Sequence, residues 1–98
     1  MSWLASTLDS GDNVATLLEP VAAQQTVLVS TSDGIVEVVA REPIALCHKI
    51  ALADIAAGAD IIKYGQCVGE ATTTIARGSW VHIHNVRSRR ARMNRGHS

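Results

Sequence analysis

The sequence predicts a compact, irregular all-β domain built from short strands and many turns of one type. One seven-residue phrase occurs at residues 44–50, 55–61 and 75–81, and in a fainter form at 21–27. Each copy has a branched aliphatic residue, two residues, a turn position, two more residues and another aliphatic, which is typical of a tight turn that leads into a strand. The copies start 23, 11 and 20 residues apart, which is too uneven for a solenoid.

Length and composition predict one modest aliphatic core. The chain has 98 residues, enough for one domain that buries roughly 60 to 65% of its unfolded surface. Hydrophobic residues make up 47% of it, but its aromatic residues are Trp3, Tyr64 and Trp80, and phenylalanine is absent. We therefore expect the core to consist mainly of valine, isoleucine, leucine and alanine.

The expected elements follow in chain order. A loose N-terminal segment comes first, and residues 12–15 could begin a strand or a one-turn helix capped by Asp12. A hairpin then places strands 26–29 and 35–39 around a turn whose Asp33-Gly34 suits positive φ. Short strands are expected after Pro43, with a loop at Gly58, over residues 49–52, 61–64, 67–71 and 80–84.

The net charge of zero conceals an acidic body and a basic tail. Residues 1–86 carry nine acidic and four basic residues, a balance of −5, whereas residues 87–98 carry five arginines, a balance of +5. Because no aromatic residues alternate with these arginines to stack on bases, we expect a solvated or partner-docking tail in preference to a nucleic-acid-binding arm.

The sequence contains neither an apolar run long enough to span a bilayer nor a recognisable N-terminal leader. We expect no membrane association and a cytoplasmic location. Cys47 and Cys67 lie far apart, without the spacing of a metal-binding pair. Reduced thiols are therefore expected, and a disulfide is the less favoured alternative.

Two histidines stand at the end of the last expected strand, in Trp80-Val81-His82-Ile83-His84-Asn85. The two-residue period of a strand would put His82 and His84 on one face and the aliphatic residues on the other. Neutral imidazoles so placed are found in sites for borderline divalent metals. The alternative is that both histidines simply face solvent at a strand end.

His48-Lys49 forms a second polar cluster, within the copy at residues 44–50. Lys49 and Lys63 could hold a substrate carboxylate as point charges, or they could be ordinary solvated strand residues. Cys47 occupies the turn position that is glycine in the copies at 55–61 and 75–81, so this turn is expected to be strained or altered.

Several of these motifs together resemble the SAF-type domain at the N-terminus of the altronate and galactarate dehydratase family. The resemblance covers about residues 8–86, and its HxHN ending is most similar to altronate dehydratases. The family also includes the small subunit of sulfolactate sulfo-lyase. The matching motifs are residues 12–15, 48–52, 54–55, 62–65 and 81–85, together with Gly69.

The resemblance implies a β-clip fold and a domain over residues 11–86, between a flexible segment at 1–10 and a basic, disordered tail at 87–98. It also implies that the chain is the small subunit of a carbon–oxygen or carbon–sulfur lyase acting on a hydroxy acid such as altronate or sulfolactate. The main catalytic domain would then belong to a separate large dehydratase-like subunit. Such chemistry needs a base for the α proton and an electrophile for the departing group.

The resemblance further implies roles for individual residues. His48 and Lys49 would be catalytic, His48 as metal ligand or proton carrier, with Lys49, Lys63 and Asn85 facing the substrate. Asn85 could also orient His82 or His84 through a hydrogen bond. His82 and His84 would hold a divalent metal, expected to be iron and shared with the large subunit. Asp9, which stands where the family often has histidine, could be an oxygen ligand, and Cys47 replaces the glycine usual before His-Lys.

Two other functions are also compatible with the sequence. The first is a non-catalytic SAF-type module that binds a small anionic ligand or a protein, and the second is an accessory protein that uses its basic tail on nucleic acid. The exposed edges of short strands would also permit a homo-oligomer. The hypothesis of a lyase subunit requires the fold to bring His48-Lys49 next to the HxHN segment.

Overall fold

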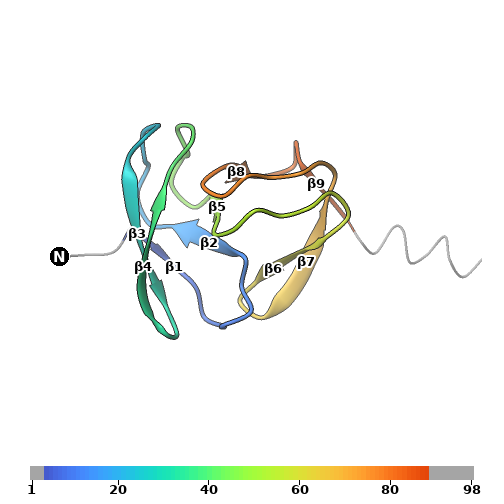
Figure 1. Cartoon of the computed structure of the whole chain (residues 1–98), viewed down its shortest axis with the longest axis horizontal. Helices are drawn as coiled ribbons and strands as arrows, with labels where there is room; N and C mark the ends of the chain where they lie inside the picture. The colour runs from blue at the N-terminus through green and yellow to red at the C-terminus, as the bar shows by residue number, and fades with distance from the viewer. Residues whose placement is uncertain (1–3, 89–98) are drawn as a thin grey trace, which may run out of the picture.

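The computed structural model describes residues 4–88, which form two β-sheets and no helix (Figure 1). The larger sheet has the strand order β4-β3-β1-β2-β5-β8, and the smaller has the order β6-β7-β9. This confirms the predicted all-β domain of short strands. The strands are β1 (Ala5–Ser6), β2 (Val14–Leu17), β3 (Thr26–Thr31), β4 (Gly34–Val39), β5 (Lys49–Ala51), β6 (Asp60–Lys63), β7 (Gln66–Ala71), β8 (Trp80–Val81) and β9 (Val86–Arg87).

All four copies of the repeated phrase fold alike, and this confirms the predicted turns. In each copy the N–H of the fifth residue donates to the C=O of the second, which closes a four-residue turn. The fourth residue has positive φ, as the third position of a type II turn requires. These φ values are 70° at Gln24, 71° at Cys47, 86° at Gly58 and 88° at Gly78.

Each turn is also fastened to the end of another segment by two reciprocal backbone hydrogen bonds. The N–H of the fourth residue of the phrase donates to the backbone carbonyl of an anchored residue. That anchored residue then donates its own N–H to the carbonyl of the fifth residue of the phrase. Backbone groups that would otherwise be buried without partners are satisfied in this way. The anchored residues are all fully buried, namely Ala40, Leu17, Ala71 and Ala51 in the order of the turns.

The core consists of two aliphatic clusters, as composition predicted. One lies within the larger sheet and includes Leu17, Val27, Val29 and Ile50, while the other joins the two sheets and includes Ile61. Each such side chain contributes about 1.5 to 3 kcal/mol when it is fully buried. The chain is therefore held together by many small aliphatic contacts.

Asp12 and Asn13 connect β2 to the smaller sheet through side-chain hydrogen bonds. The Asn13 amide accepts from the Ile62 N–H at 2.7 Å and donates to the Asp60 carbonyl at 2.8 Å, and Asp12 accepts from the Gly65 N–H at 2.7 Å. Burial raises the pKa of Asp12, but backbone hydrogen bonds, led by that of Gly65, outweigh this effect and leave the pKa below its ordinary value. The residues that could have begun a helix therefore form a strand and a polar link.

The predicted hairpin is present, with a shorter loop than expected. β3 and β4 pair from Thr26 with Val39 to Thr31 with Gly34, which leaves Ser32-Asp33 as the loop. Strands thus continue through residues that the sequence assigned to the turn. The reason is that Gly34, at φ 125°, already pairs with Thr31.

The ends of the domain differ from the predicted boundaries. Residues 1–10 were expected to be flexible, yet β1 lies between β2 and β3 and Ala5 is fully buried. At the other end, Arg87 belongs to β9 and donates to the buried Glu70 carboxylate at 2.9 Å. Most of the predicted basic tail, residues 89–98, lies outside the described residues.

Gly78 provides a test of how closely the turns are packed. Its φ is close to that of Gly58, but a Cβ at Gly78 would overlap the Val39 carbonyl oxygen, whereas a Cβ at Gly58 would meet open space. We expect Gly58→Ala to lower the free energy of unfolding by about 1 to 2 kcal/mol through backbone strain alone. Gly78→Ala should cost about 2 kcal/mol more through overlap. Urea denaturation of both variants measures the difference, and equal losses would contradict the packing.

Candidate functional site

The pairing of β5 with β8 brings the two predicted site segments together. Lys49 lies opposite Val81, and Ile50 lies opposite Trp80. Both His48 and Trp80 lie in copies of the repeated phrase. His48 is the fifth residue of its copy, and Trp80 is the sixth residue of its copy. The hypothesis of a lyase subunit required His48-Lys49 to lie next to the HxHN segment, and the strand pairing places them so.

Four aromatic rings from these segments form one cluster, which we call the ring cluster: His48, Trp80, His82 and His84. The His48 and His82 rings stack with centroids 4.5 Å apart, and Trp80 stacks on His82 at 5.4 Å. His84 lies against Trp80 at 4.7 Å. The two predicted histidine groups thus contact each other directly.

A hydrogen bond within the ring cluster fixes how His48 can act. The indole N–H of Trp80 donates to Nδ1 of His48 at 2.9 Å. Because an indole N–H can only donate, Nδ1 of His48 must carry a lone pair, and in the neutral ring the proton is then on Nε2. In this arrangement His48 presents an N–H donor at Nε2. The same geometry disfavours His48 as a metal ligand through that atom.

The HxHN segment is a turn, and the strand predicted over residues 80–84 is wrong beyond Val81. β8 ends at Val81, and the Asn85 N–H donates to the His82 carbonyl. The alternating-face argument for His82 and His84 therefore does not apply. Instead, both rings pack against Trp80. Ile83, between them, is 83% exposed.

Asn85 holds this turn in shape. Its side chain is only 7% exposed; Oδ1 accepts from the His82 N–H and Nδ2 donates to the Trp80 carbonyl, both at 2.9 Å. These hydrogen bonds occupy both ends of the amide. We therefore assign Asn85 to positioning His82, which is one of the two roles that the sequence suggested for it.

Lys49 and His82 line a hollow of about 280 Å³, together with Val68, Ile83, Val86, Arg87 and Ser88. Partial desolvation and the positive charge of Lys63 lower the pKa of Lys49. Partial desolvation also lowers the pKa of His82, with further contributions from His48, Lys49 and His84. The hollow is thus lined by one lysine, which feels the charge of Lys63, and by an imidazole that favours its neutral form.

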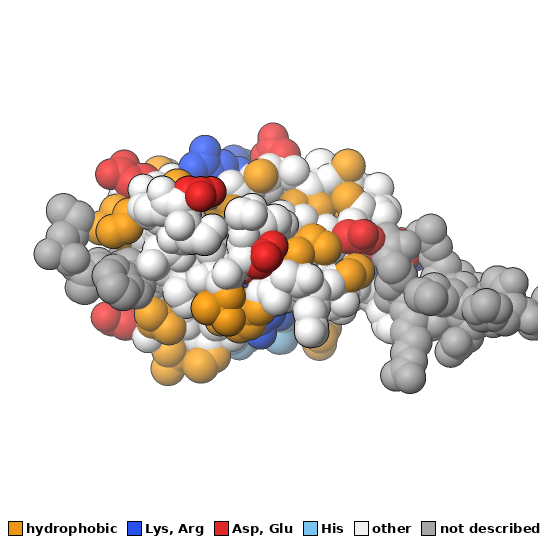
Figure 2. Space-filling view, turned by 90° about the horizontal axis from the view of Figure 1, so that it is seen from below, with side chains coloured by type: hydrophobic (Ala, Val, Ile, Leu, Met, Phe, Trp, Pro, Cys, Tyr) orange, Lys and Arg blue, Asp and Glu red, His pale blue; other side chains and the backbone are white. Residues whose placement is uncertain are grey.

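A second hollow, of about 390 Å³, lies beside His48 and Trp80. His48 and Trp80 line it with apolar residues, namely Pro20, Val21, Pro43, Ile44 and Ala45. The ring cluster therefore contributes to a polar hollow through His82 and to an apolar one through His48. Figure 2 shows histidine and basic side chains side by side at one edge of the molecule, next to hydrophobic ones.

The described residues do not assemble the predicted metal site by themselves. No three histidine, cysteine, aspartate or glutamate side chains within residues 4–88 lie close enough together to hold an ion. Asp9 accepts from the Gly11 N–H at 2.8 Å and lines a separate hollow with Asp12. His82 and His84 therefore offer two imidazoles without Asp9.

Trp80 is the site residue that sequence reasoning missed. Its position, immediately before the HxHN segment and in a chain with few aromatic residues, was the available signal. Cys47, by contrast, is exposed and has a positive φ of 71°, close to that of Gln24 and about 15° below those of Gly58 and Gly78, so the turn before His48 still forms without glycine.

Comparison with known proteins agrees with the geometry. Residues 4–89 match the model of the altronate/galactarate dehydratase SAF domain. The chain is 44% identical to altronate dehydratase of Escherichia coli over 77 residues, which are 79% of this chain but 15% of that protein. It is 33% identical to the (2R)-sulfolactate sulfo-lyase subunit alpha of Chromohalobacter salexigens over 84% of this chain and 90% of that one. A shorter match, 53% identical over 34 residues, is to galactarate dehydratase of Escherichia coli and covers 35% of this chain and 6% of that protein.

The lowered pKa of His82 gives a direct test of the site's electrostatics. In metal-free protein, the His82 ring should titrate below the ordinary value of 6.5 in NMR spectra. Lys49→Met should move this pKa upward, because one of the charges that oppose protonation is removed. Arg41→Met, which removes a charge elsewhere, serves as the control. An unchanged His82 pKa in Lys49→Met would contradict the described arrangement.

Proposed function

Because the chain belongs to the altronate/galactarate dehydratase SAF-domain family, we propose that it is the small subunit of a lyase that removes water or sulfite from a hydroxy acid. The observation that carries this proposal is the direct contact of His48 with His82 beside Lys49. Residues from two distant segments thus meet at one hollow, as a shared site requires.

The lysine pair is suited to the carboxylate of the substrate. Lys49 is partly desolvated and lies close enough to Lys63 for its charge to be disfavoured. A bound carboxylate would offset both effects, because an opposite charge nearby stabilises the ammonium form. We assign Lys49 to direct contact and Lys63 to the surrounding field.

We assign different roles to the imidazoles of His48 and His82. His48 lines the neighbouring apolar hollow but stacks on His82, so we assign it to donation through Nε2 at the edge of the site, since its Nδ1 is engaged by Trp80. The lowered pKa of His82 keeps this ring unprotonated near neutral pH, the form that can accept a proton or bind a metal. The site on this chain therefore binds and orients the substrate and supplies one basic nitrogen.

A divalent metal, which we propose to be iron, would be held by His82 and His84 with further ligands from the large subunit. Imidazole nitrogens suit such an ion, and two of them from one turn leave room for ligands from another chain. When bound, the ion would supply Lewis-acid support for the departing group. We leave Asp9 out of this role, because it lines a separate hollow with Asp12 and not the one at His82.

We propose that a large catalytic subunit completes the site. One relative of nearly the same length is itself named as a subunit alpha, and the chain spans about 15% of altronate dehydratase. The hollow at Lys49 is lined in part by the exposed Ile83 and Val68. Such exposed apolar residues at a site rim suit contact with another protein.

The alternative is a non-catalytic binding module in the cytoplasm. The apolar hollow beside His48 and Trp80 favours it, because apolar hollows with a few polar groups are typical of ligand sites. In that case the chain would bind a small anion or a protein without supporting elimination.

Reconstitution separates the two functions. The chain should co-purify with a large subunit from its source, and the pair, supplied with iron, should eliminate water or sulfite from altronate, galactarate or sulfolactate. Lys49→Met should lower kcat/KM by about 100-fold or more, through loss of the carboxylate contact, while Lys49→Arg should retain part of it. A reconstituted pair that is inactive on all three acids would favour the binding module.

Trp80→Phe tests the role of His48. This variant keeps an aromatic ring but removes the indole donor, so Nδ1 of His48 is released and both tautomers become available. We expect kcat/KM to fall about tenfold and the ¹⁵N shifts of His48 to report a mixture of tautomers. Tyr64→Phe, which removes a polar group outside the ring cluster, should change neither. A single Nε2–H tautomer in Trp80→Phe would contradict the assignment.

A further inference from the structure

Two of the four basic residues of the acidic body, Arg41 and Arg77, line a further hollow away from the proposed site. The other two are Lys49, which lines the proposed site, and Lys63, whose charge acts on Lys49. Figure 2 accordingly shows basic side chains in two separate places, one of them beside the histidines. The ion pair found within residues 4–88 involves none of these four residues, because it joins Arg87 to Glu70.

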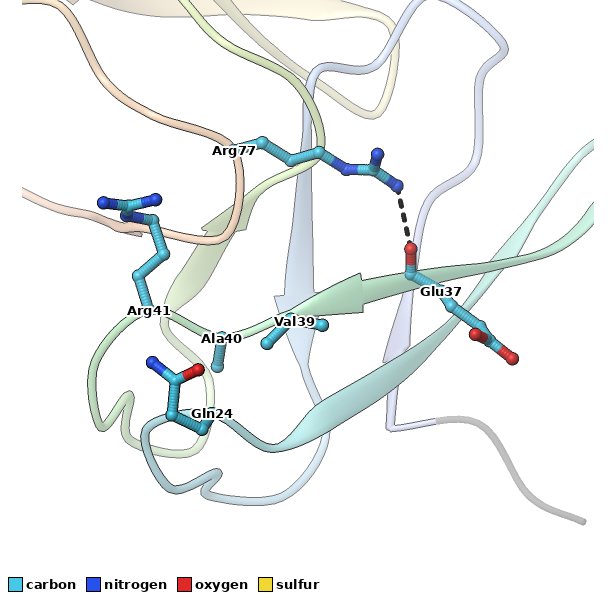
Figure 3. A pocket seen from close by; sticks show the side chains of 6 residues that line it. All are labelled: Gln24, Glu37, Val39, Ala40, Arg41 and Arg77. Atoms are coloured by element: carbon cyan, nitrogen blue, oxygen red, sulfur yellow. Dashed lines mark hydrogen bonds between the residues drawn. The ribbon is translucent and has the colours of Figure 1, made fainter.

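This further hollow has a volume of about 400 Å³, and the residues that line it are drawn in Figure 3. Arg41 and Arg77 flank it from different segments, and the Glu37 side chain points away from it. Gln24, Val39 and Ala40 complete its lining. We call it the arginine hollow.

The guanidinium groups retain most of their hydrogen-bonding capacity. Nη2 of Arg77 donates to the Glu37 carbonyl at 2.8 Å, which holds this side chain across the hollow. The Arg41 guanidinium makes no hydrogen bond to any residue of the described range, and its stem packs over Gly78. No carboxylate within residues 4–88 lies within ion-pair distance of either group.

The backbone beneath the arginines is fixed by the repeated turns. The Arg41 N–H donates to the Gly78 carbonyl at 2.9 Å, the Gln24 N–H donates to the Ala40 carbonyl at 2.7 Å, and the Arg77 N–H donates to Asp54 at 2.8 Å. Because both side chains start from anchored positions, little backbone ordering would be needed to bind a ligand between them.

We propose that the arginine hollow is a second binding site, for a small anion that carries a carboxylate or phosphoryl group. Guanidinium groups match such oxyanions through paired N–H donors, and the volume lies in the range of small-molecule sites. None of the lining residues belongs to the ring cluster or to its hollows.

NMR titration at constant ionic strength tests this proposal, with inorganic phosphate and malonate as the two probes. Saturable shifts should appear at the amides of Gln24, Ala40, Arg41 and Gly78, and the probe that binds more tightly identifies the preferred group. Arg41→Ala and Arg77→Ala should each weaken binding about tenfold or more. Arg41→Lys should weaken it less, because a point charge is kept while the paired donors are lost.

Matched variants separate this site from the proposed lyase site. Lys49→Met removes one positive charge from the proposed lyase site and should leave phosphate and malonate binding at the arginine hollow unchanged. The proposal is independent of lyase activity, so an inactive reconstituted pair would not affect it. Shifts that do not saturate, or that persist unchanged in Arg41→Ala and Arg77→Ala, would overturn it.

Discussion

The reciprocal pair of backbone hydrogen bonds made by each repeated turn is the constraint on which this small domain depends. The chain has few long strands and no helix among its described residues, so most of its backbone order comes from local devices. Each turn donates to a buried residue and accepts from it, and so satisfies two interior groups at once. Aliphatic side chains at the ends of each phrase then enter the core.

The same turns and their reciprocal hydrogen bonds also position the candidate site. The turns at residues 44–50 and 75–81 lead into β5 and β8, and the antiparallel pairing of these strands sets His48 against Trp80. Asn85 then closes the next turn and places His82 on the two rings. The side chains of His48, Trp80 and His82 thus start from backbone that is held by hydrogen bonds, and a binding site needs such support for precise geometry.

Local patterns in the sequence predicted the turns, the β3–β4 hairpin and the aliphatic core, because these depend on nearby residues. The meeting of His48 with His82 was inferred from a family resemblance, since it depends on strand pairing across distant segments. The strand expected through His84 was wrong because the Asn85 amide favours a turn, and a two-residue period cannot reveal that hydrogen bond. β1 was missed because two residues carry no periodicity.

The role of Trp80 could not be read from sequence, because it rests on one side-chain hydrogen bond. That bond limits His48 to donation through Nε2 and leaves His82 as the available basic nitrogen. The arginine hollow follows a similar rule. Arg41 and Arg77 lie far apart in sequence and line one hollow only after the turns place them.

We propose that the ring cluster and the Lys49 hollow face a partner chain. This can be tested by amide hydrogen exchange of the protein, measured alone and together with the large subunit proposed for it. We expect slower exchange at residues 45–49 and 82–86 in the complex, with the hairpin loop at Ser32-Asp33 unchanged. Protection confined to the hairpin loop, or no protection at either site segment, would contradict it.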